Sequence, residues 1–347
     1  MLTYSIMLLI LLFMALIVAV RDGRGKQADF FDLESSNCMR GFWCLVILLV
    51  HVPTAYQNTL QDLTGSFAYI GVTFFFMTSG YGLMLGIKNK GIKSIEGFWL
   101  RRLPKLLLPM FLTNIVLSLA NLCQTGVYNP ADLINFHGFV RQLLVFYFIF
   151  WAVFRFIPQK VSENQKTLII CGAVLLISLS IYIFKISACA TESFGFIYGI
   201  LLAHYKSEFE AFAKQKWLAK SIGFCAAALI FGIAYLKFKH VVFIGEYLIK
   251  VILGLAILIF ILTLNSKISI GNPVGRFMGK ISYEVYLLHG AVFTLISSIA
   301  PDINSGLFIL LSILVTVALS PVINRISNMI LSLISKPATK NAGDGVK

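Results

Sequence analysis

Charged residues are scarce in this sequence, and the short motifs of several common enzyme classes are missing. Asp, Glu, Lys and Arg make up only 13% of the 347 residues, whereas a soluble globular domain carries about 25%. The sequence contains no phosphate-binding glycine loop, no His-Glu-x-x-His motif and no Gly-x-Ser-x-Gly motif. These absences argue against a soluble domain and give no support to P-loop, zinc-peptidase or α/β-hydrolase chemistry.

The cysteines show no spacing typical of a metal or redox site. The six of them are scattered along the chain, mostly inside apolar stretches, at Cys38, Cys44, Cys123, Cys171, Cys189 and Cys225. In such surroundings a cysteine behaves as a small hydrophobic residue. We therefore expect no metal ion. The sequence also shows no obvious repeat, no low-complexity tract and no soluble second domain.

Hydrophobic residues, by contrast, are abundant and occur in long runs. They account for 58% of the chain, and the mean hydropathy is +0.86. About 20 apolar residues are enough for a helix to span a bilayer, where the backbone must satisfy its own hydrogen bonds. The sequence predicts an all-α polytopic membrane protein with about eleven transmembrane helices, at residues 2–20, 41–59, 67–86, 104–122, 139–157, 168–186, 190–205, 219–237, 241–264, 281–300 and 305–321. Residues 322–335, after Pro321, are predicted to form a separate amphipathic segment at the inner surface.

Positive charges alternate between the predicted loops. The formal net charge is +14, and Lys and Arg concentrate in every second loop, although Lys237 and Lys239 break the pattern. This distribution follows the positive-inside rule rather than a nucleic-acid-binding face. It predicts that the N-terminus lies outside and the C-terminus in the cytoplasm. We expect a multi-pass protein of the cell membrane (a bacterial inner or plasma membrane) that contacts membrane lipid and no nucleic acid.

Arg40 and His51 form the most informative pair. At roughly 100° per residue, the eleven steps between them are three turns plus about 20°, so both side chains occupy one helix face, roughly 16 Å apart. Ionisable residues on a membrane helix are costly, and they mark functional sites by default. With the predicted topology, Arg40 lies at the cytoplasmic end of the second span and His51 near mid-membrane.

A second histidine, His289, is predicted at a comparable depth. It lies on the tenth span, which also runs outward, and it shares a helix face with Ser282 and Tyr286 at spacings of four and three residues. Two histidines that reach one depth from two helices suggest a shared site.

Basic residues also mark the entrance to the fourth span. Arg101, Arg102 and Lys105 follow a Phe-Trp-Leu run there. One interpretation is a solvated positive-inside anchor. The other is a clamp for phosphates that arrive from the cytoplasm, since guanidinium groups bind phosphate oxygens bidentately.

Structural interpretations of the same residues remain open. A membrane histidine can simply hydrogen-bond a neighbouring helix, and Arg40 can extend to the headgroups. Glu246 and Lys250, four residues apart, can neutralise each other. A proton-coupled transporter or flippase, with His51, His289 and Glu246 as the relay, is the alternative function, and a non-catalytic scaffold is a third.

Four segments, in their order along the chain, resemble the membrane acyltransferase-3 family. They are the Arg-x10-His spacing of Arg40 and His51, Gly-Val-x-x-Phe-Phe-x-x-Ser-Gly at 71–80, Arg-Arg-Leu at 101–103 and Ser-Tyr-x-x-Tyr-Leu-x-His at 282–289. The resemblance covers about residues 33–335. It implies a ten-helix acyltransferase-3-like membrane domain at 33–335, an extra N-terminal transmembrane helix and cytoplasmic loop at 1–32, and a cytoplasmic tail at 336–347.

The resemblance implies transfer of an acyl group, commonly acetyl, from cytoplasmic acyl-CoA to a hydroxyl of a cell-surface polysaccharide or its lipid-linked precursor. His51 would be the general base or a transient acyl carrier. Arg40 would bind the CoA phosphates or polarise the thioester. Phosphates at the entrance would be bound by Arg101, Arg102 and Lys105. Acceptor binding or proton transfer would fall to Tyr286 and His289.

The chain departs from the family pattern at two positions. Thr73 stands where the family often has Asp, which removes a possible acidic partner for the site. Lys105 stands where the second Arg of an Arg-x-x-Arg pair is usual, which weakens bidentate phosphate binding. No hydrolase-like domain follows the membrane domain, so a second acyl-handling step is expected to need another protein.

Overall fold

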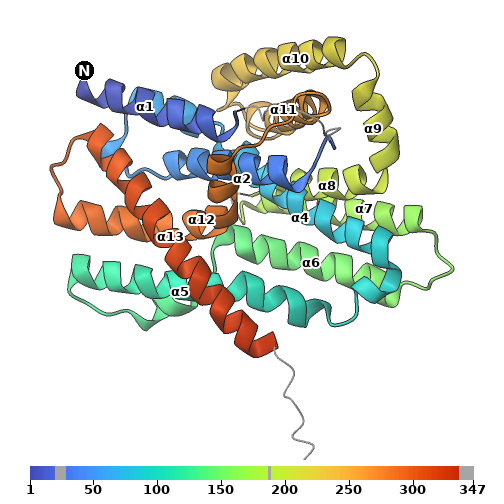
Figure 1. Ribbon diagram of the computed structural model, residues 1–347, viewed down its shortest axis with the longest axis horizontal. Helices are drawn as coiled ribbons and strands as arrows, with labels where there is room; N and C mark the ends of the chain where they lie inside the picture. Colours follow the sequence, from blue (N-terminus) through green and yellow to red (C-terminus); the bar gives the residue numbers. More distant parts are fainter. Residues whose placement is uncertain (20–28, 187–188, 336–347) are drawn as a thin grey trace, which may run out of the picture.

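The computed structural model describes residues 1–19, 29–186 and 189–335, and long helices dominate these ranges (Figure 1). The α-helices are α1 (Leu2–Ile17), α2 (Leu33–Val50), α3 (Thr59–Gly65), α4 (Ala68–Lys90), α5 (Phe98–Thr125), α6 (Gly138–Phe156), α7 (Glu163–Phe184), α8 (Phe194–His204), α9 (Lys206–Lys214), α10 (Trp217–Phe238), α11 (Lys250–Asn265), α12 (Pro273–Ile299) and α13 (Ser305–Ser335). Short helical turns connect them: η1 (Thr54–Tyr56), η2 (Gly91–Ser94), η3 (Pro130–Ile134), η4 (Thr191–Ser193) and the π-helical η5 (Ile244–Ile249).

Eight helical segments of the described ranges are long and apolar enough to cross a membrane. The predicted count of eleven is therefore not confirmed, although each predicted span coincides with a helix. α1 and α8 have only 16 and 11 residues. α12 has 27 residues, but it is not among the eight, and it contains Lys280, Glu284 and His289. The chain is a multi-pass membrane protein whose more polar helices pack inside the bundle.

α2 begins eight residues earlier than predicted and ends at Val50 rather than at residue 59. Asp32 caps its first turn, where the carboxylate accepts a hydrogen bond from Ser35 N at 2.7 Å. The first two turns are polar, so a search for apolar runs misses them. His51 therefore caps the end of the helix instead of lying midway along the span. Val52 precedes Pro53, and a residue before proline disfavours helical geometry.

α13 runs without interruption through Pro321, so the predicted separate segment at 322–335 is wrong. A membrane helix tolerates the missing N–H of a proline where neighbouring groups compensate. Tertiary packing holds the part beyond the proline, because Asn324 donates a hydrogen bond to Glu284 Oε1 on α12 at 2.8 Å. Ile323 and Ser327 are buried on the same stretch. The predicted tail at 336–347 lies outside the described residues.

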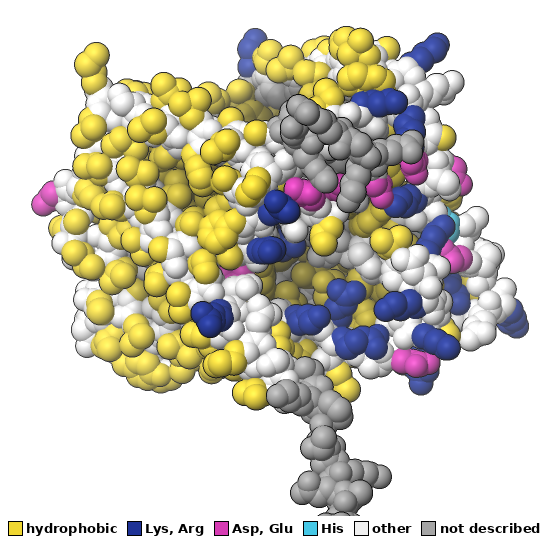
Figure 2. Space-filling view, in the orientation of Figure 1, with side chains coloured by type: hydrophobic (Ala, Val, Ile, Leu, Met, Phe, Trp, Pro, Cys, Tyr) yellow, Lys and Arg dark blue, Asp and Glu magenta, His cyan; other side chains and the backbone are white. Residues whose placement is uncertain are grey.

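Several predicted cytoplasmic loops meet at one end of the bundle, which we call the basic end. Lys88, at the end of α4, donates to the carbonyl of His204 at the end of α8. Lys206 pairs with Asp29 before α2 at 2.8 Å, and Arg276 of α12 pairs with Glu34 of α2 at 3.4 Å. Lys and Arg gather on the right of the space-filling view, whereas its left part is mainly hydrophobic (Figure 2). The absolute orientation in a membrane stays a prediction, and the basic loop residues Arg21, Arg24, Lys26, Lys336, Lys340 and Lys347 lie outside the described residues.

Glycine residues let α4 and α8 pack closely against each other. A Cβ atom on Gly80 of α4 would collide with the carbonyl of Phe196 on α8. In return, a Cβ on Gly195 or Gly199 of α8 would overlap the backbone of α4. Gly195 and Gly199 form a Gly-x-x-x-Gly pair, which lets two helix backbones approach closely. This contact holds the short α8 in the bundle although its own length is small.

We predict that Gly199→Ala destabilises the protein by about 1–3 kcal/mol, because the added methyl group overlaps the α4 backbone and forces the helices apart. The unfolding midpoint of the purified chain in lipid nanodiscs measures the effect. Gly223→Ala on α10 is the matched control, since no atom lies within 4 Å of its added Cβ. Equal midpoints for the two variants would contradict the proposed packing.

Candidate functional site

A cavity of about 510 Å³ extends from the basic end into the bundle. It is bounded by α2, α4, α5, α6 and α12 and by the segment that precedes α2. Along α6 its lining reaches from Tyr147 to Phe139, eight residues or roughly 12 Å. The polar early turns of α2 supply Ser36, Asn37 and Arg40 to this lining. Facing a cavity rather than lipid explains why these turns tolerate polar residues.

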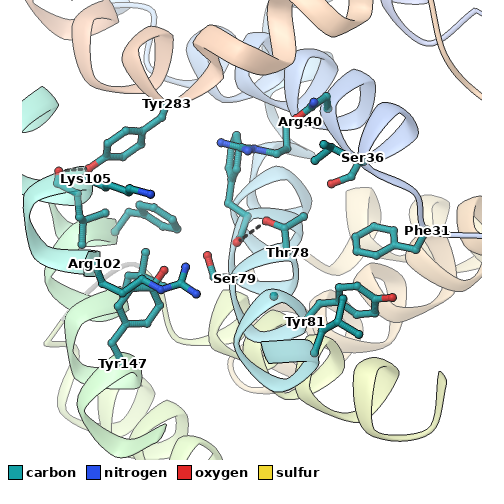
Figure 3. Close-up of a pocket in the computed structure, with 18 of the residues that line it drawn as sticks. Phe31, Ser36, Arg40, Thr78, Ser79, Tyr81, Arg102, Lys105, Tyr147 and Tyr283 are labelled. Carbon is teal, nitrogen blue, oxygen red and sulfur yellow. Dashed lines mark hydrogen bonds between the residues drawn. The ribbon is translucent and has the colours of Figure 1, made fainter. Parts of the chain in front are cut away.

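Three predicted site residues, Arg40, Arg102 and Lys105, line this cavity together. Their side chains approach the same space from α2 on one side and α5 on the other (Figure 3). One acidic residue, Asp32, belongs to the lining, and its carboxylate already accepts bonds from Ser35 N and Ser35 Oγ. Within the described ranges no carboxylate lies within ion-pair distance of the three cations. The cavity is therefore suited to an anionic ligand.

Arg40 lies deeper in the structure than predicted. It is the eighth residue of α2, its guanidinium carbon is 5.8 Å from the centroid of the Phe75 ring, and its Nε atom is buried without a hydrogen bond in the described part of the chain. A buried, unsatisfied donor of this kind is rare in native proteins. The residue is thus placed to meet a ligand inside the cavity rather than at its mouth.

Arg101 does not line the cavity. Its side chain is exposed, and Nη2 donates a hydrogen bond to the carbonyl of Ser94 at 2.8 Å. Arg102 and Lys105 both belong to the cavity lining, whereas the Arg101 side chain is held toward the η2 turn by its bond to Ser94. The structure therefore divides the predicted basic clamp into two cavity residues and one residue outside.

His51 and His289 lie side by side, with ring centroids 4.9 Å apart. His51 is exposed, whereas His289 is only 8% exposed and its Nδ1 makes no hydrogen bond with the described residues. The predicted convergence of the two histidines is thus confirmed. Both lie toward the end of the bundle opposite to the basic end.

A backbone carbonyl orients His51. The amide N–H of His51 bonds to Leu48 O at 3.1 Å, which leaves the carbonyl of Ile47 free at the helix end. His51 Nδ1 lies 2.8 Å from that carbonyl. Because a carbonyl can only accept, Nδ1 carries the hydrogen and Nε2 keeps its lone pair. The ring is therefore held as a base without a carboxylate partner.

Thr73 has no such role toward the histidine. It is buried, and its hydroxyl donates to Tyr69 O on its own helix at 2.9 Å. The substitution of the usual Asp therefore leaves a side chain that is satisfied within α4.

Two aromatic rings separate the cavity from the histidine pair. Phe139 lines the inner end of the cavity, and its ring centroid is 5.4 Å from that of Tyr286. The Tyr286 ring in turn lies 6.0 Å from His289. Tyr286 is therefore next to both the cavity wall and the histidines, as its place on the face of His289 predicted.

The transporter relay lacks its acidic member. Glu246 is exposed in η5, and Tyr182 OH donates to it at 3.5 Å. Among described residues no hydrogen bond or ion pair joins it to His51, His289 or Lys250. The ammonium of Lys250 instead lies 5.2 Å from the centroid of the Tyr69 ring. The predicted Glu246–Lys250 pair is therefore absent in the described part of the chain.

Some residues of the site were not predicted from the sequence. Phe139, Tyr147 and Tyr283 line the cavity, and Tyr283 OH ties α12 to α5 through a 2.8 Å hydrogen bond to Leu106 O. His137 approaches Tyr286 with a ring distance of 6.3 Å. Phe139 and Tyr147 gave no signal, because aromatic residues are common in apolar helices, whereas Tyr283 belongs to the family segment at 282–289, which assigned it no role. His137 is one of only five histidines, and its position just before a span was the available hint.

Comparison with known proteins identifies the family of the chain. The family model of acyltransferase 3, described as an acyltransferase domain, matches residues 33–325. Two relatives from Staphylococcus aureus, strains MSSA476 and COL, are each named "Putative O-acetyltransferase" and are 26% identical to this chain over 330 residues. The match covers 80% of this chain and 54% of each relative, so the chain spans about half the length of the curated relatives that it matches. No solved structure gives a significant match.

The range matched by the family model includes the residues of the candidate site. The matched region begins at the first residue of α2 and extends into α13. It contains the cavity-lining cations and both histidines. Since the family model covers most of the chain, this multi-pass membrane protein belongs to the acyltransferase 3 family.

Proposed function

We propose that the protein is an integral-membrane O-acyltransferase that moves an acyl group, acetyl by expectation, from cytoplasmic acyl-CoA to a hydroxyl of a cell-surface polysaccharide or its lipid-linked precursor. The observation that supports this most directly is the continuous arrangement of a cationic cavity, a layer formed by Phe139 and Tyr286, and an oriented histidine pair. We place it in the cell membrane, a bacterial inner or plasma membrane, with the basic end in the cytoplasm.

The donor fits the cavity by charge. The phosphates of acyl-CoA are anionic, and Arg102 and Lys105 lie on α5 close to its start at the basic end. A guanidinium binds phosphate oxygens in pairs, whereas an ammonium binds them as a point charge. Arg40, deeper in the cavity, is placed to receive a further phosphate.

In this proposal His51 activates the hydroxyl group of the acceptor. Its Nε2 lone pair can take the proton of the acceptor hydroxyl while the oxygen attacks the thioester carbonyl. The new C–O bond forms, the C–S bond breaks, and the proton passes to the leaving thiolate, so the reaction is balanced without another reactant. In the alternative sequence, Nε2 attacks the thioester carbonyl, the C–S bond breaks and the thiolate leaves; the hydroxyl then attacks the acyl group, the C–N bond breaks, and the hydroxyl proton passes to the thiolate. Either sequence needs the unprotonated Nε2 that the Ile47 carbonyl favours.

We predict that His51→Gln lowers acetyl transfer by at least about 100-fold, because glutamine can bond to Ile47 O but cannot act as a base. Thiol release from acetyl-CoA by the purified chain, with the membrane level checked by immunoblotting, measures this. His240→Ala is the control, since this histidine is exposed in the connection between α10 and η5. Full activity in His51→Gln would refute the catalytic role. An acetyl group trapped on His51 in the absence of acceptor would identify the covalent sequence.

We predict that Arg102→Ala raises the KM for acetyl-CoA about 10- to 100-fold, since a charge-assisted hydrogen bond is lost. Arg101→Ala should have a smaller effect, because this side chain lies outside the cavity lining. Lys93→Ala, in the exposed turn η2, is the matched control. Steady-state kinetics with varied acetyl-CoA give the values. A larger change for Arg101→Ala than for Arg102→Ala would contradict the assignment of the cavity as the donor site.

A further inference from the structure

His137 extends the histidine pair toward the end of the bundle opposite to the basic end. It is the residue just before α6, and its ring lies 6.3 Å from that of Tyr286. Tyr286 lies 6.0 Å from His289, and His289 lies 4.9 Å from His51. Three of the five histidines of the chain thus lie in one series with a tyrosine, although they come from three distant parts of the sequence.

His137 has an unused hydrogen-bonding atom. Its Nε2 is buried and makes no hydrogen bond with any described residue. The same holds for Nδ1 of the neighbouring His289. A buried polar atom without a partner is unfavourable, and native proteins keep few of them. Two such nitrogens around one tyrosine indicate a place where a polar ligand completes the hydrogen bonds.

The chain segment that leads to His137 is held in place. Asn114, buried on α5, donates from Nδ2 to the carbonyls of Leu133 at 3.2 Å and Asn135 at 2.9 Å. These bonds attach the segment to α5 two residues before the histidine. Its ring is therefore presented from a supported backbone, which is what a binding residue requires.

The position of His137 favours the acceptor over the donor. It does not belong to the cavity lining, whereas Phe139, two residues later, forms the inner end of that cavity. The cations that suit the donor phosphates lie on the other side of the Phe139–Tyr286 layer, toward the basic end. A neutral imidazole with a free nitrogen suits a hydroxyl group better than a phosphate.

We propose that His137 is an acceptor-binding residue, whose Nε2 forms a hydrogen bond with a hydroxyl of the sugar and presents it to the histidine pair. This inference rests on the proposed acyltransferase function and adds the acceptor site to it. His137 makes or breaks no covalent bond. It fixes the sugar beside Tyr286 and His289 while His51 takes the proton of the reacting hydroxyl.

The test uses the full chain in lipid nanodiscs, with acetyl-CoA as donor and N-acetylglucosamine as the acceptor probe. His137→Ala should raise the KM for the sugar about 10-fold, the value of one lost hydrogen bond, and leave the KM for acetyl-CoA unchanged. His137→Gln, which places an amide near the position of Nε2, should restore part of the affinity. His240→Ala is again the matched histidine control.

Each outcome separates the inference from the function on which it rests. A wild-type chain that acetylates no sugar contradicts the proposed function. An active wild type with an unchanged sugar KM in His137→Ala overturns the acceptor role of His137 alone. Equal increases in both KM values, together with a lowered unfolding midpoint and no recovery in His137→Gln, assign the residue a structural role and also overturn it.

Discussion

Positive charge gathered around a cavity that opens at one end of an apolar helix bundle is the constraint on which the rest of this structure depends. Arg40, Arg102 and Lys105 share one cavity, and no described carboxylate neutralises them. Such charges are costly in a membrane protein unless they face a polar space. The cavity provides that space, and its walls come from five helices, α2, α4, α5, α6 and the distant α12. Close packing elsewhere, such as that of α4 against α8, holds the helices of the walls in place.

The same constraint explains the division of the bundle into a cationic part and a histidine part. The cations lie toward the basic end, while His51 and His289 lie beyond the layer of Phe139 and Tyr286. This layer keeps the apolar interior continuous between two polar regions. An acyl group is small and uncharged, so it is the part of the donor that can approach the histidines without carrying phosphate across the layer. The arrangement thus suits a transferase whose two substrates come from opposite sides.

Much of the fold could be predicted because hydrophobic runs and loop charges directly report which segments enter a membrane. Each predicted span coincides with a helix, but helix boundaries failed wherever polar residues face the protein interior. α2 starts earlier since Ser36, Asn37 and Arg40 line the cavity. α13 continues through Pro321 because Asn324 packs against Glu284. Neither the cavity beside α2 nor the contact between Asn324 and Glu284 can be predicted from the local sequence pattern.

Within the site, the helical spacing of Arg40 and His51 and that of Tyr286 and His289 was determined by the sequence itself, because helix geometry fixes which residues share a face. The four family segments were likewise determined by the sequence itself, since they depend on residue order alone. Tertiary structure decided which basic residues enter the cavity and that His137 lies beside Tyr286. The physical reason is that these contacts join helices far apart in the chain, and their distances exist only once the helices have packed.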